Sequence, residues 1–374
     1  MYDQAGKRNN NLQYQFHDET RVKYAKTERL RLVSGGKLLV QSGQNDDRFV
    51  SLSLAARVAL HTVRNILLRR PLCIALEVTH NCCANCRHCD KGGQIAEQVV
   101  NASAYKMICE EIDPVVIQIS GGEPLLRDDL TQIVKALYRL DRTPFLVLVT
   151  NGFLLTEEKY IALREAGIGQ FSISLDFPDY RHDDFRRIPG LFGRLDRLIP
   201  ELISTGNEDI IINTCITRAN YLYLPDIVAR VADWGAKLNF SAYTDLRTHD
   251  KDLNLRHPED TRKFKRIIDD LYSGNHRQYV MTSEKVMRRF AGYFENCYMP
   301  NCQSGRNFLI VNPDGRLTPC AMHAESRFVS RKELLQGFTI SNRCGHCYIS
   351  IRANTEKPVH ELFIDNLRFA RSLI

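Results

Sequence analysis

Most of the twelve cysteines of this chain fall into two groups. Four lie within residues 82–89, and five gather between residues 297 and 347. Clustered cysteines are typical of thiolate ligands for metals or iron–sulfur clusters, whereas disulfides are typical of secreted chains. The sequence opens without the apolar run of a secretory signal, so we expect a reducing, cytoplasmic setting in which these cysteines are ligands.

The first group could hold an iron–sulfur cluster with one open iron. Thiolates of Cys82, Cys86 and Cys89 could bind three irons of a [4Fe–4S] cluster and leave the fourth free to chelate a small molecule. The alternative is zinc, with His88 as the fourth ligand. Cys83 gives a competing register, because it also forms an evenly spaced triad with Cys86 and Cys89. Spacing alone favours the cluster over zinc and leaves both registers open.

The second group could ligate one metal centre completely. Cys302 and Cys320 flank a predicted β-hairpin, and Cys344 and Cys347 form a Cys-x2-Cys turn. Either a [4Fe–4S] cluster or zinc suits four such thiolates, and the residues by themselves slightly favour zinc. Cys297 is a spare that could replace a ligand, act in catalysis or simply be buried.

Strands and helices that alternate along the chain must position these thiols. The predicted strands are Leu72–Val78, Val115–Ser120, Phe145–Thr150, Gln170–Leu175, Ile210–Ile216 and Lys237–Ala242. Amphipathic stretches typical of helices lie between them, which predicts an α/β fold with a parallel sheet. We expect a partial (β/α)6 barrel, with a doubly wound sheet as the alternative. In both, residues 82–89 follow the carboxyl end of the first strand.

The chain divides into four predicted parts. Residues 1–71 form an N-terminal extension, with the first fifteen expected to be disordered and an amphipathic helix at about residues 52–70. Residues 72–250 form the barrel and residues 251–295 a helical connector. Residues 296–374 form a small cysteine-rich domain.

Charge and hydrophobicity narrow the partners only partly. The formal net charge of +7 suits an anionic substrate, a nucleic acid or a membrane surface equally well. The helix at about residues 52–70 could lie on anionic lipid at the inner face of a membrane, or pack against the barrel. Its basic face carries Arg57, His61 and Arg64. Its apolar face carries Leu60, Val63 and Leu67. The sequence has no run of about 20 apolar residues, so we predict no membrane-spanning segment.

A second motif decides between the readings of the first group. Residues 120–125, Ser-Gly-Gly-Glu-Pro-Leu, follow the second predicted strand. Together with Cys-x3-Cys-x2-Cys after the first strand, this pattern resembles the radical S-adenosylmethionine (SAM) superfamily over about residues 72–245. The resemblance implies that Cys82, Cys86 and Cys89 hold a [4Fe–4S] cluster whose open iron binds SAM. It makes Cys83 a variable residue of the loop.

The resemblance also implies which residues contact SAM. His88 lies at the position near the adenine in this family, and the Gly-Gly-Glu-Pro segment contacts the amino group. The residues expected to bind the cofactor are His88, Gly121, Gly122, Glu123, Pro124, Ser174, Asp176 and Asn213. Cys302, Cys320, Cys344 and Cys347 resemble the ligands of a twitch domain, a shortened SPASM domain, which implies a second, auxiliary [4Fe–4S] cluster for electron transfer.

The resemblance implies an enzyme that cleaves SAM reductively to a 5′-deoxyadenosyl radical, which abstracts a hydrogen atom from a substrate carbon. We expect a net oxidation in a biosynthetic pathway, with modification of a peptide, lipid or sugar without net oxidation as the alternative. A flavodoxin- or ferredoxin-type reductant is implied. We place a peptide or protein substrate ahead of a small metabolite, and a lipid precursor stays open. The rival from another class, a non-catalytic zinc or nucleic-acid-binding protein, leaves Gly121–Pro124 unexplained.

Overall fold

The computed structural model describes the chain over most of its length. The described residues are 30–33, 37–40, 46–140, 142, 144–358 and 361–362, with side chains from residue 56 onward. The first fifteen residues, expected to be disordered, lie outside these ranges. A short antiparallel hairpin, β1 (Leu30–Val33) and β2 (Lys37–Val40), precedes the main body.

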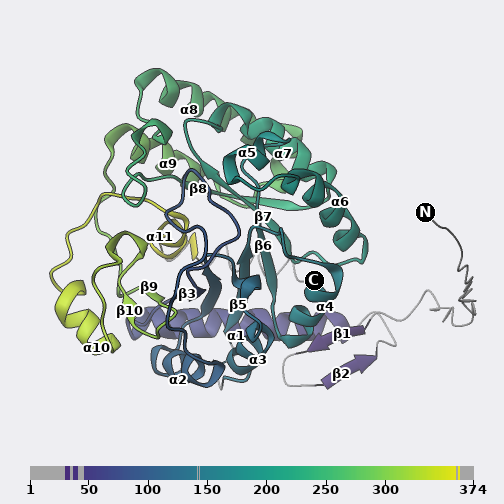
Figure 1. Cartoon of the computed structure of the whole chain (residues 1–374), viewed down its shortest axis with the longest axis vertical. Helices are drawn as coiled ribbons and strands as arrows, with labels where there is room; N and C mark the ends of the chain where they lie inside the picture. The colour runs from purple at the N-terminus through teal and green to yellow at the C-terminus, as the bar shows by residue number, and fades with distance from the viewer. Residues whose placement is uncertain are drawn as a thin grey trace, which may run out of the picture.

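One sheet of eight strands organises the molecule (Figure 1). Its strand order is β10-β9-β3-β4-β5-β6-β7-β8, and all neighbours except β10 and β9 run parallel. The strands are β3 (Cys73–Thr79), β4 (Val116–Gly121), β5 (Phe145–Thr150), β6 (Gln170–Ser174), β7 (Ile210–Ile216), β8 (Lys237–Ala242), β9 (Phe308–Val311) and β10 (Leu317–Thr318). The six predicted strands are therefore present, with ends shifted by a residue or so.

The strand order distinguishes the two predicted architectures. From β3 to β8 the strands lie side by side in the order in which they occur in the chain, and this order never reverses. A doubly wound sheet requires a reversal of the strand order. Sequential right-handed crossovers instead leave all helices on one face, as in a barrel. The partial barrel is thus confirmed. The hairpin β9–β10, predicted to belong to a separate small domain, instead extends the barrel sheet, because β9 pairs in parallel with β3.

Helices alternate with these strands much as the amphipathic pattern predicts. Side chains of Asn101, Thr156 and Ser283 cap three of them by accepting a backbone N–H. The helices are α1 (Asp46–Leu67), α2 (Ala102–Ile112), α3 (Leu130–Tyr138), α4 (Glu157–Ala166), α5 (Arg181–Arg186), α6 (Leu191–Ser204), α7 (Leu224–Asp233), α8 (Pro258–Ser273), α9 (Glu284–Asn296), α10 (Arg331–Leu334) and α11 (Ser350–Thr355). Short α5 had no signal in the periodicity, and it proves important below.

The two faces of the sheet differ in chemistry. On β3, Ile74 and Leu76 are fully buried in the main apolar core, which lies under the helices. Alternate residues of the same strand, such as Glu77 and Thr79, point to the opposite, inner face. The later strands also place polar residues there. These include Gln118, Ser120, Ser172, Ser174, Asn213, Asn239 and Ser241. The partial barrel therefore presents a polar inner surface to a ligand.

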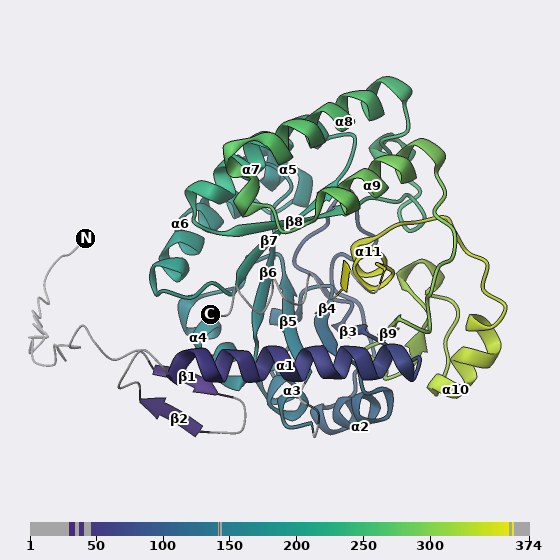
Figure 2. The same ribbon diagram turned by 180° about the vertical axis from the view of Figure 1, so that it is seen from behind.

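Helix α1 crosses the sheet near the amino ends of its strands (Figure 2). Val58 of α1 packs in one apolar cluster with Leu72 and Val115, which directly precede β3 and β4. On the predicted basic face, Arg64 forms an ion pair with Asp113 at 2.6 Å and His61 approaches the same carboxylate at 3.2 Å.

Much of the basic face of α1 is thus used inside the protein, which favours the predicted packing against the barrel over a basic face on lipid. No helix among the described residues is long and apolar enough to cross a membrane.

Candidate active site

The cysteine loop follows β3 at the carboxyl end of the sheet, as predicted. The thiols of Cys82 and Cys86 are buried, that of Cys89 is partly buried, and Cys83 is exposed. Backbone N–H groups point at two of these sulfurs, since the Ala84 nitrogen lies 3.4 Å from Cys82 Sγ and the Lys91 nitrogen 3.4 Å from Cys89 Sγ. Such N–H···S contacts stabilise thiolates and tune iron–sulfur clusters. Three thiols on one short loop fit a cluster that leaves one iron open.

The competing register is visible in the structure. The Cys82 and Cys83 thiols hydrogen-bond to each other, which lowers the pKa of Cys83 to about 6 and raises that of Cys82. Asn151, just after β5, places its Nδ2 3.3 Å from Cys83 Sγ and 4.0 Å from Cys82 Sγ. Cys83 is the most solvent-exposed thiol of the loop. Cys82 as the ligand stays a prediction that a variant of Cys83 can test.

Within the described residues, no three His, Cys, Asp or Glu side chains converge on a single metal-ion position.

The paired glycines brace the cysteine loop. The Gly122 nitrogen donates to the Thr79 carbonyl at 2.7 Å, and the Glu123 nitrogen donates to the Asn81 carbonyl at 2.8 Å. A Cβ added at Gly121 would lie 2.1 Å from the Thr79 carbonyl oxygen, and one at Gly122 would lie 2.0 Å from that of Asn81. Glycine is required at both positions by this contact with the loop. The two glycines therefore allow the backbone at the end of β4 to approach the loop that carries the thiols.

Glu123 is fully buried at the same junction. Its carboxylate accepts hydrogen bonds from Thr150 Oγ1 at 2.7 Å, the Asn151 nitrogen at 2.9 Å and the Leu125 nitrogen at 3.1 Å. Burial raises the pKa of Glu123 to about 7, although these hydrogen bonds act to lower it. Glu123 thereby ties the end of β5 to the short turn that begins at Pro124. Contact of Gly121–Pro124 with SAM stays a prediction.

Asp176 corrects one predicted cofactor contact. Its carboxylate is fully buried, 2.7 Å from Arg186 Nη2, and also accepts the Cys215 nitrogen at 3.2 Å. Burial would raise the pKa of Asp176, but the Arg186 guanidinium holds it below its ordinary value. The Arg186 carbonyl in turn accepts the Asn85 nitrogen of the cysteine loop at 3.3 Å. Asp176 therefore anchors α5 beneath the loop and leaves no exposed oxygen for the SAM ribose.

His88 lies between two of the predicted ligands with one free ring nitrogen. Its ring stacks on Phe185 of α5, with ring centroids 4.9 Å apart and an angle of 9° between the planes. Burial lowers its pKa to about 4, so the ring is neutral at pH 7. Its Nδ1 is buried without a hydrogen-bond partner among the described residues. A neutral, stacked ring with an unused nitrogen suits the predicted position beside an adenine, which remains a prediction.

Ser174 is the last residue of β6, whereas Asn213 lies in the middle of the neighbouring strand β7. They face each other across β6 and β7, and both are partly exposed on the inner face. The Asn213 amide donates to the Ser172 hydroxyl. These groups line the polar inner surface of the sheet, where a ligand's hydroxyls could bind.

Sequence reasoning missed a charged network at the mouth of the barrel. Glu77, on the inner face of β3, lies 2.8 Å from His80 Nε2 and 3.5 Å from Lys91 Nζ. Burial alone would raise the pKa of Glu77, but the hydrogen bond with His80 and the charges of Lys91 and Arg247 hold it at about 2. Arg247, from the segment after β8, also pairs with Asp90. The signal was the charged Glu-x-Thr-His segment before Cys82, but its partners come from distant parts of the chain.

The second cysteine group comes from three separate segments, and its role as a ligand set stays a prediction. Cys302 and Cys320 are buried in one apolar cluster with Cys73 of β3, and Cys344 packs against it. The Cys302 and Cys344 thiols hydrogen-bond to each other, which lowers the pKa of Cys344 to about 3. Burial raises the pKa of the Cys347 thiol, and the charge of Cys344 also raises it.

Two further side chains, those of His323 and Cys297, differ in their contacts. His323 also donates toward the Cys344 thiol. Cys297 is the αL C-cap of α9, with φ 51°, and its Sγ lies 3.9 Å from the Phe294 carbonyl oxygen. A catalytic or ligand role for Cys297 stays a prediction.

Comparison with known proteins agrees with this geometry. Residues 76–218 match the family described as the radical SAM superfamily. Over these residues the chain is similar to members of that superfamily. Over 188 residues it is 33% identical to an AdoMet-dependent heme synthase of Oleidesulfovibrio alaskensis, covering 48% of this chain and 47% of that protein. It is 29% identical to a PqqA peptide cyclase of Gluconobacter oxydans, covering 44% and 47%. These matches span about half of each relative.

Solved structures of radical SAM proteins share the fold. Streptococcus suis SuiB bound to S-adenosylmethionine superposes with a TM-score of 0.55 at 14% identity, over 81% of this chain and 68% of that one. The structure described as anSMEcpe with bound AdoMet gives a TM-score of 0.56 at 18% identity, over 71% and 81%. At these identities the likeness shows the fold. A [4Fe–4S] cluster and SAM are the cofactors of the radical SAM superfamily.

Proposed function

We propose that this chain is a radical SAM enzyme that modifies a peptide or protein in a biosynthetic pathway, by a net oxidation in which an auxiliary cluster accepts an electron. Cys82, Cys86 and Cys89 hold the SAM-binding cluster. Cys302, Cys320, Cys344 and Cys347 hold the auxiliary cluster. When bound, the first cluster and SAM supply a 5′-deoxyadenosyl radical that takes a hydrogen atom from the substrate.

The placement of the two cysteine groups at opposite ends of one strand carries this proposal. The first group follows the carboxyl end of β3, while Cys73 at its amino end packs against Cys302 and Cys320. Seven residues of strand separate these ends, a distance of about 20 Å. The polar inner face lies between them. A substrate bound on that face would have the radical source at one end and an electron acceptor at the other.

The chain's own residues would orient and shield the reaction. Asn151 offers a hydrogen-bonding group beside the loop, and Ser174 and Asn213 offer others on the inner face of the sheet. Glu77 with Lys91 forms a charged rim. Holding reactants in a site closed to water is the contribution that proteins make to cofactor chemistry. Because SAM chemistry needs an electron from outside, a flavodoxin- or ferredoxin-type reductant belongs to the proposal.

Two relatives support a peptide substrate. One is described as a PqqA peptide cyclase, and a structure of SuiB bound to the precursor peptide SuiA aligns with 87% of this chain and 73% of that one, with a TM-score of 0.53. Peptide recognition in those proteins says what their sites bind, and we extend it to this chain as a proposal.

Anaerobic reconstitution tests the core of the proposal. The reconstituted protein should be brown, hold two [4Fe–4S] clusters and form 5′-deoxyadenosine from SAM only when dithionite is present. Candidate precursor peptides encoded beside its gene should then lose the mass of two hydrogen atoms for each oxidation. A colourless, zinc-containing protein would reject the radical reading. An unchanged mass with all such peptides, despite 5′-deoxyadenosine formation, would reject the substrate class alone.

A further inference from the structure

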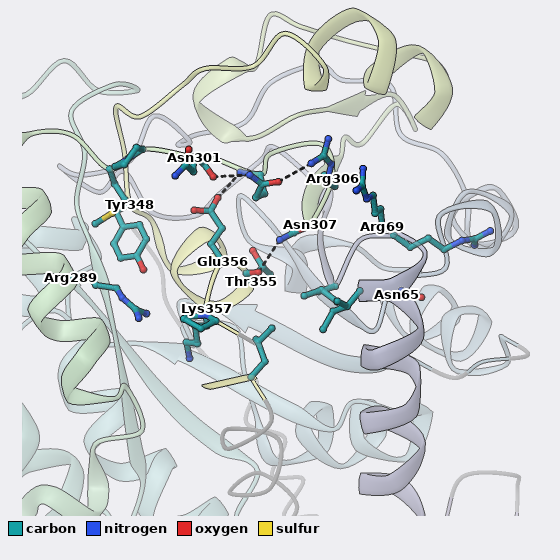
Figure 3. A pocket seen from close by; sticks show the side chains of 18 residues that line it. Asn65, Arg69, Arg289, Asn301, Arg306, Asn307, Tyr348, Thr355, Glu356 and Lys357 are labelled. Carbon is teal, nitrogen blue, oxygen red and sulfur yellow. Dashed lines mark hydrogen bonds between the residues drawn. The ribbon is translucent and has the colours of Figure 1, made fainter. Parts of the chain in front are cut away.

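A cavity of about 520 Å³ opens between α1, α11 and the segment before β9 (Figure 3). The Leu72 nitrogen donates to the Asn307 carbonyl at 2.8 Å, so the cavity lies where β3 and β9 begin. The cysteine loop lies at the other end of β3. This cavity is therefore separate from the proposed reaction centre, and its volume is in the range of ordinary small-molecule sites.

The walls of the cavity are strongly cationic. Among the described residues that line it, Glu356 is the one acidic residue, and it already accepts the Gln303 nitrogen at 2.7 Å and Arg352 Nε at 2.7 Å. Five basic residues line the same space: Arg69, Arg70, Arg289, Arg306 and Lys357. The cavity thus carries a clear excess of positive charge.

Two of these guanidinium groups form no ion pair within the described part of the chain. Arg70 pairs with Asp113 at 3.3 Å and Arg289 with Glu361 at 2.9 Å, whereas Arg69 and Arg306 pair with no carboxylate there. Arg306 is partly buried, and its Nη1 has a single contact, to Gln303 Oε1 at 3.3 Å. A partly buried cation with one weak acceptor is poorly compensated, which favours an anionic ligand.

The backbone at Arg69 adds a second observation. Arg69 has φ 51°, in the left-handed region that non-glycine residues rarely adopt. This conformation ends α1 and directs the Arg69 side chain to the cavity wall (Figure 3). In Figure 3 Arg69 and Arg306 lie on one side of the space, and Arg289 and Lys357 lie on the other. A ligand there meets cations from two directions.

We propose that this cavity binds a phosphorylated ligand, held by Arg69 and Arg306 at the junction of α1 with the auxiliary-cluster segment. Guanidinium groups match phosphate oxygens in a fork of paired hydrogen bonds. Amide groups of Asn301 and Asn307 supply further polar contacts. The ligand would rest on the segments that carry two auxiliary thiols, since Gln303 follows Cys302 and Tyr348 follows Cys347.

The phosphate could belong to a free metabolite or to a lipid headgroup. Leu67 and Leu68, directly before Arg69, are 76% and 55% exposed, so an acyl chain could lie against them. Both sources share the same phosphate chemistry, and the experiment below distinguishes them.

Binding of pyrophosphate to the reconstituted full-length protein, measured by calorimetry, tests the proposal. The wild type should bind, and Arg306→Ala should bind at least about tenfold more weakly, since a charge-assisted hydrogen bond is lost. Arg197→Ala, an exposed arginine on α6, is the matched control and should bind as the wild type does. In a second arm, co-sedimentation with phosphatidylcholine vesicles, with and without phosphatidic acid, assigns the phosphate to lipid if only the acidic vesicles are bound.

Two further measurements distinguish a loss of ligand binding from misfolding of the variant. Iron content should equal that of the wild type in Arg306→Ala, and Arg306→Lys, which keeps the charge but loses the fork, should bind with intermediate strength. Absence of binding by the wild type to both pyrophosphate and acidic vesicles would overturn the proposal. So would an equal loss of binding in Arg197→Ala.

Discussion

The two cysteine groups of this chain are built in opposite ways. The first draws all its thiols from one loop of eight residues, residues 82–89, held from outside by Gly122, Glu123 and Arg186. The second brings together thiols from three segments that span residues 302–347, inside an apolar cluster that includes Cys73. A locally coded site can keep its ligands while its surroundings vary, whereas a site assembled by tertiary packing depends on the fold around it.

The largest expected effect separates the two registers of the first group. Cys86→Ala should abolish dithionite-dependent 5′-deoxyadenosine, because each thiolate binds one iron of the cluster. Cys82→Ala should do the same, whereas Cys83→Ala should retain product formation. High-performance liquid chromatography of the nucleoside gives the answer. Loss of activity in Cys83→Ala together with activity in Cys82→Ala would assign the ligand to Cys83 instead.

The second-largest effect concerns only the second cysteine group, which is assembled from three segments. Cys302→Ala or Cys347→Ala should lower iron by about four atoms per chain while SAM cleavage continues, because the first cluster is built independently. Cys297→Ala is the matched control, and its iron content should equal that of the wild type. Iron analysis and cleavage assays on the same samples measure both. If Cys302→Ala loses no iron, the second group does not hold a cluster.

The smallest expected effect concerns the support of the first loop. Asp176→Asn removes the partner of the buried Arg186 and should destabilise the chain by about 3 kcal/mol, the usual cost of breaking a buried ion pair. Asp233→Asn, an exposed carboxylate on α7, should change stability by less than about 0.5 kcal/mol. Urea unfolding followed by circular dichroism compares them. Equal stability of the two variants would contradict the anchoring role of Asp176.

The contrast between the groups also explains what the sequence could predict. Strands and most helices follow from apolar periodicity, and the first thiol group follows from spacing, because both are local signals. The residues of the second group also suggested a metal centre, but the choice of a [4Fe–4S] cluster over zinc required the resemblance, since no spacing rule links Cys302 to Cys344. Asp176 was misread because a carboxylate at a strand end can face a ligand or a buried arginine. That choice depended on α5, a helix too short to show periodicity.

The cavity had no sequence signal for the same reason, and the charged rim had only the local segment from Glu77 to His80, because its other members come from distant parts of the chain. Arg69, Arg306 and Lys357 are far apart in the chain, and each is ordinary in its own context. Only the parallel pairing of β9 with β3 brings the segment of Arg306 to the end of α1.

The pairing of β9 with β3 has a consequence for how the molecule can be divided. β3 would otherwise be an edge strand with unpaired N–H and carbonyl groups, and such edges template aggregation. The auxiliary-cluster segment thus completes the hydrogen bonding of the first barrel strand. The barrel and the auxiliary-cluster segment should therefore unfold together. A chain cut between them would expose the unpaired edge of β3, which would be prone to aggregation. This C-terminal segment is therefore an integral part of the barrel sheet, not a separately folding unit.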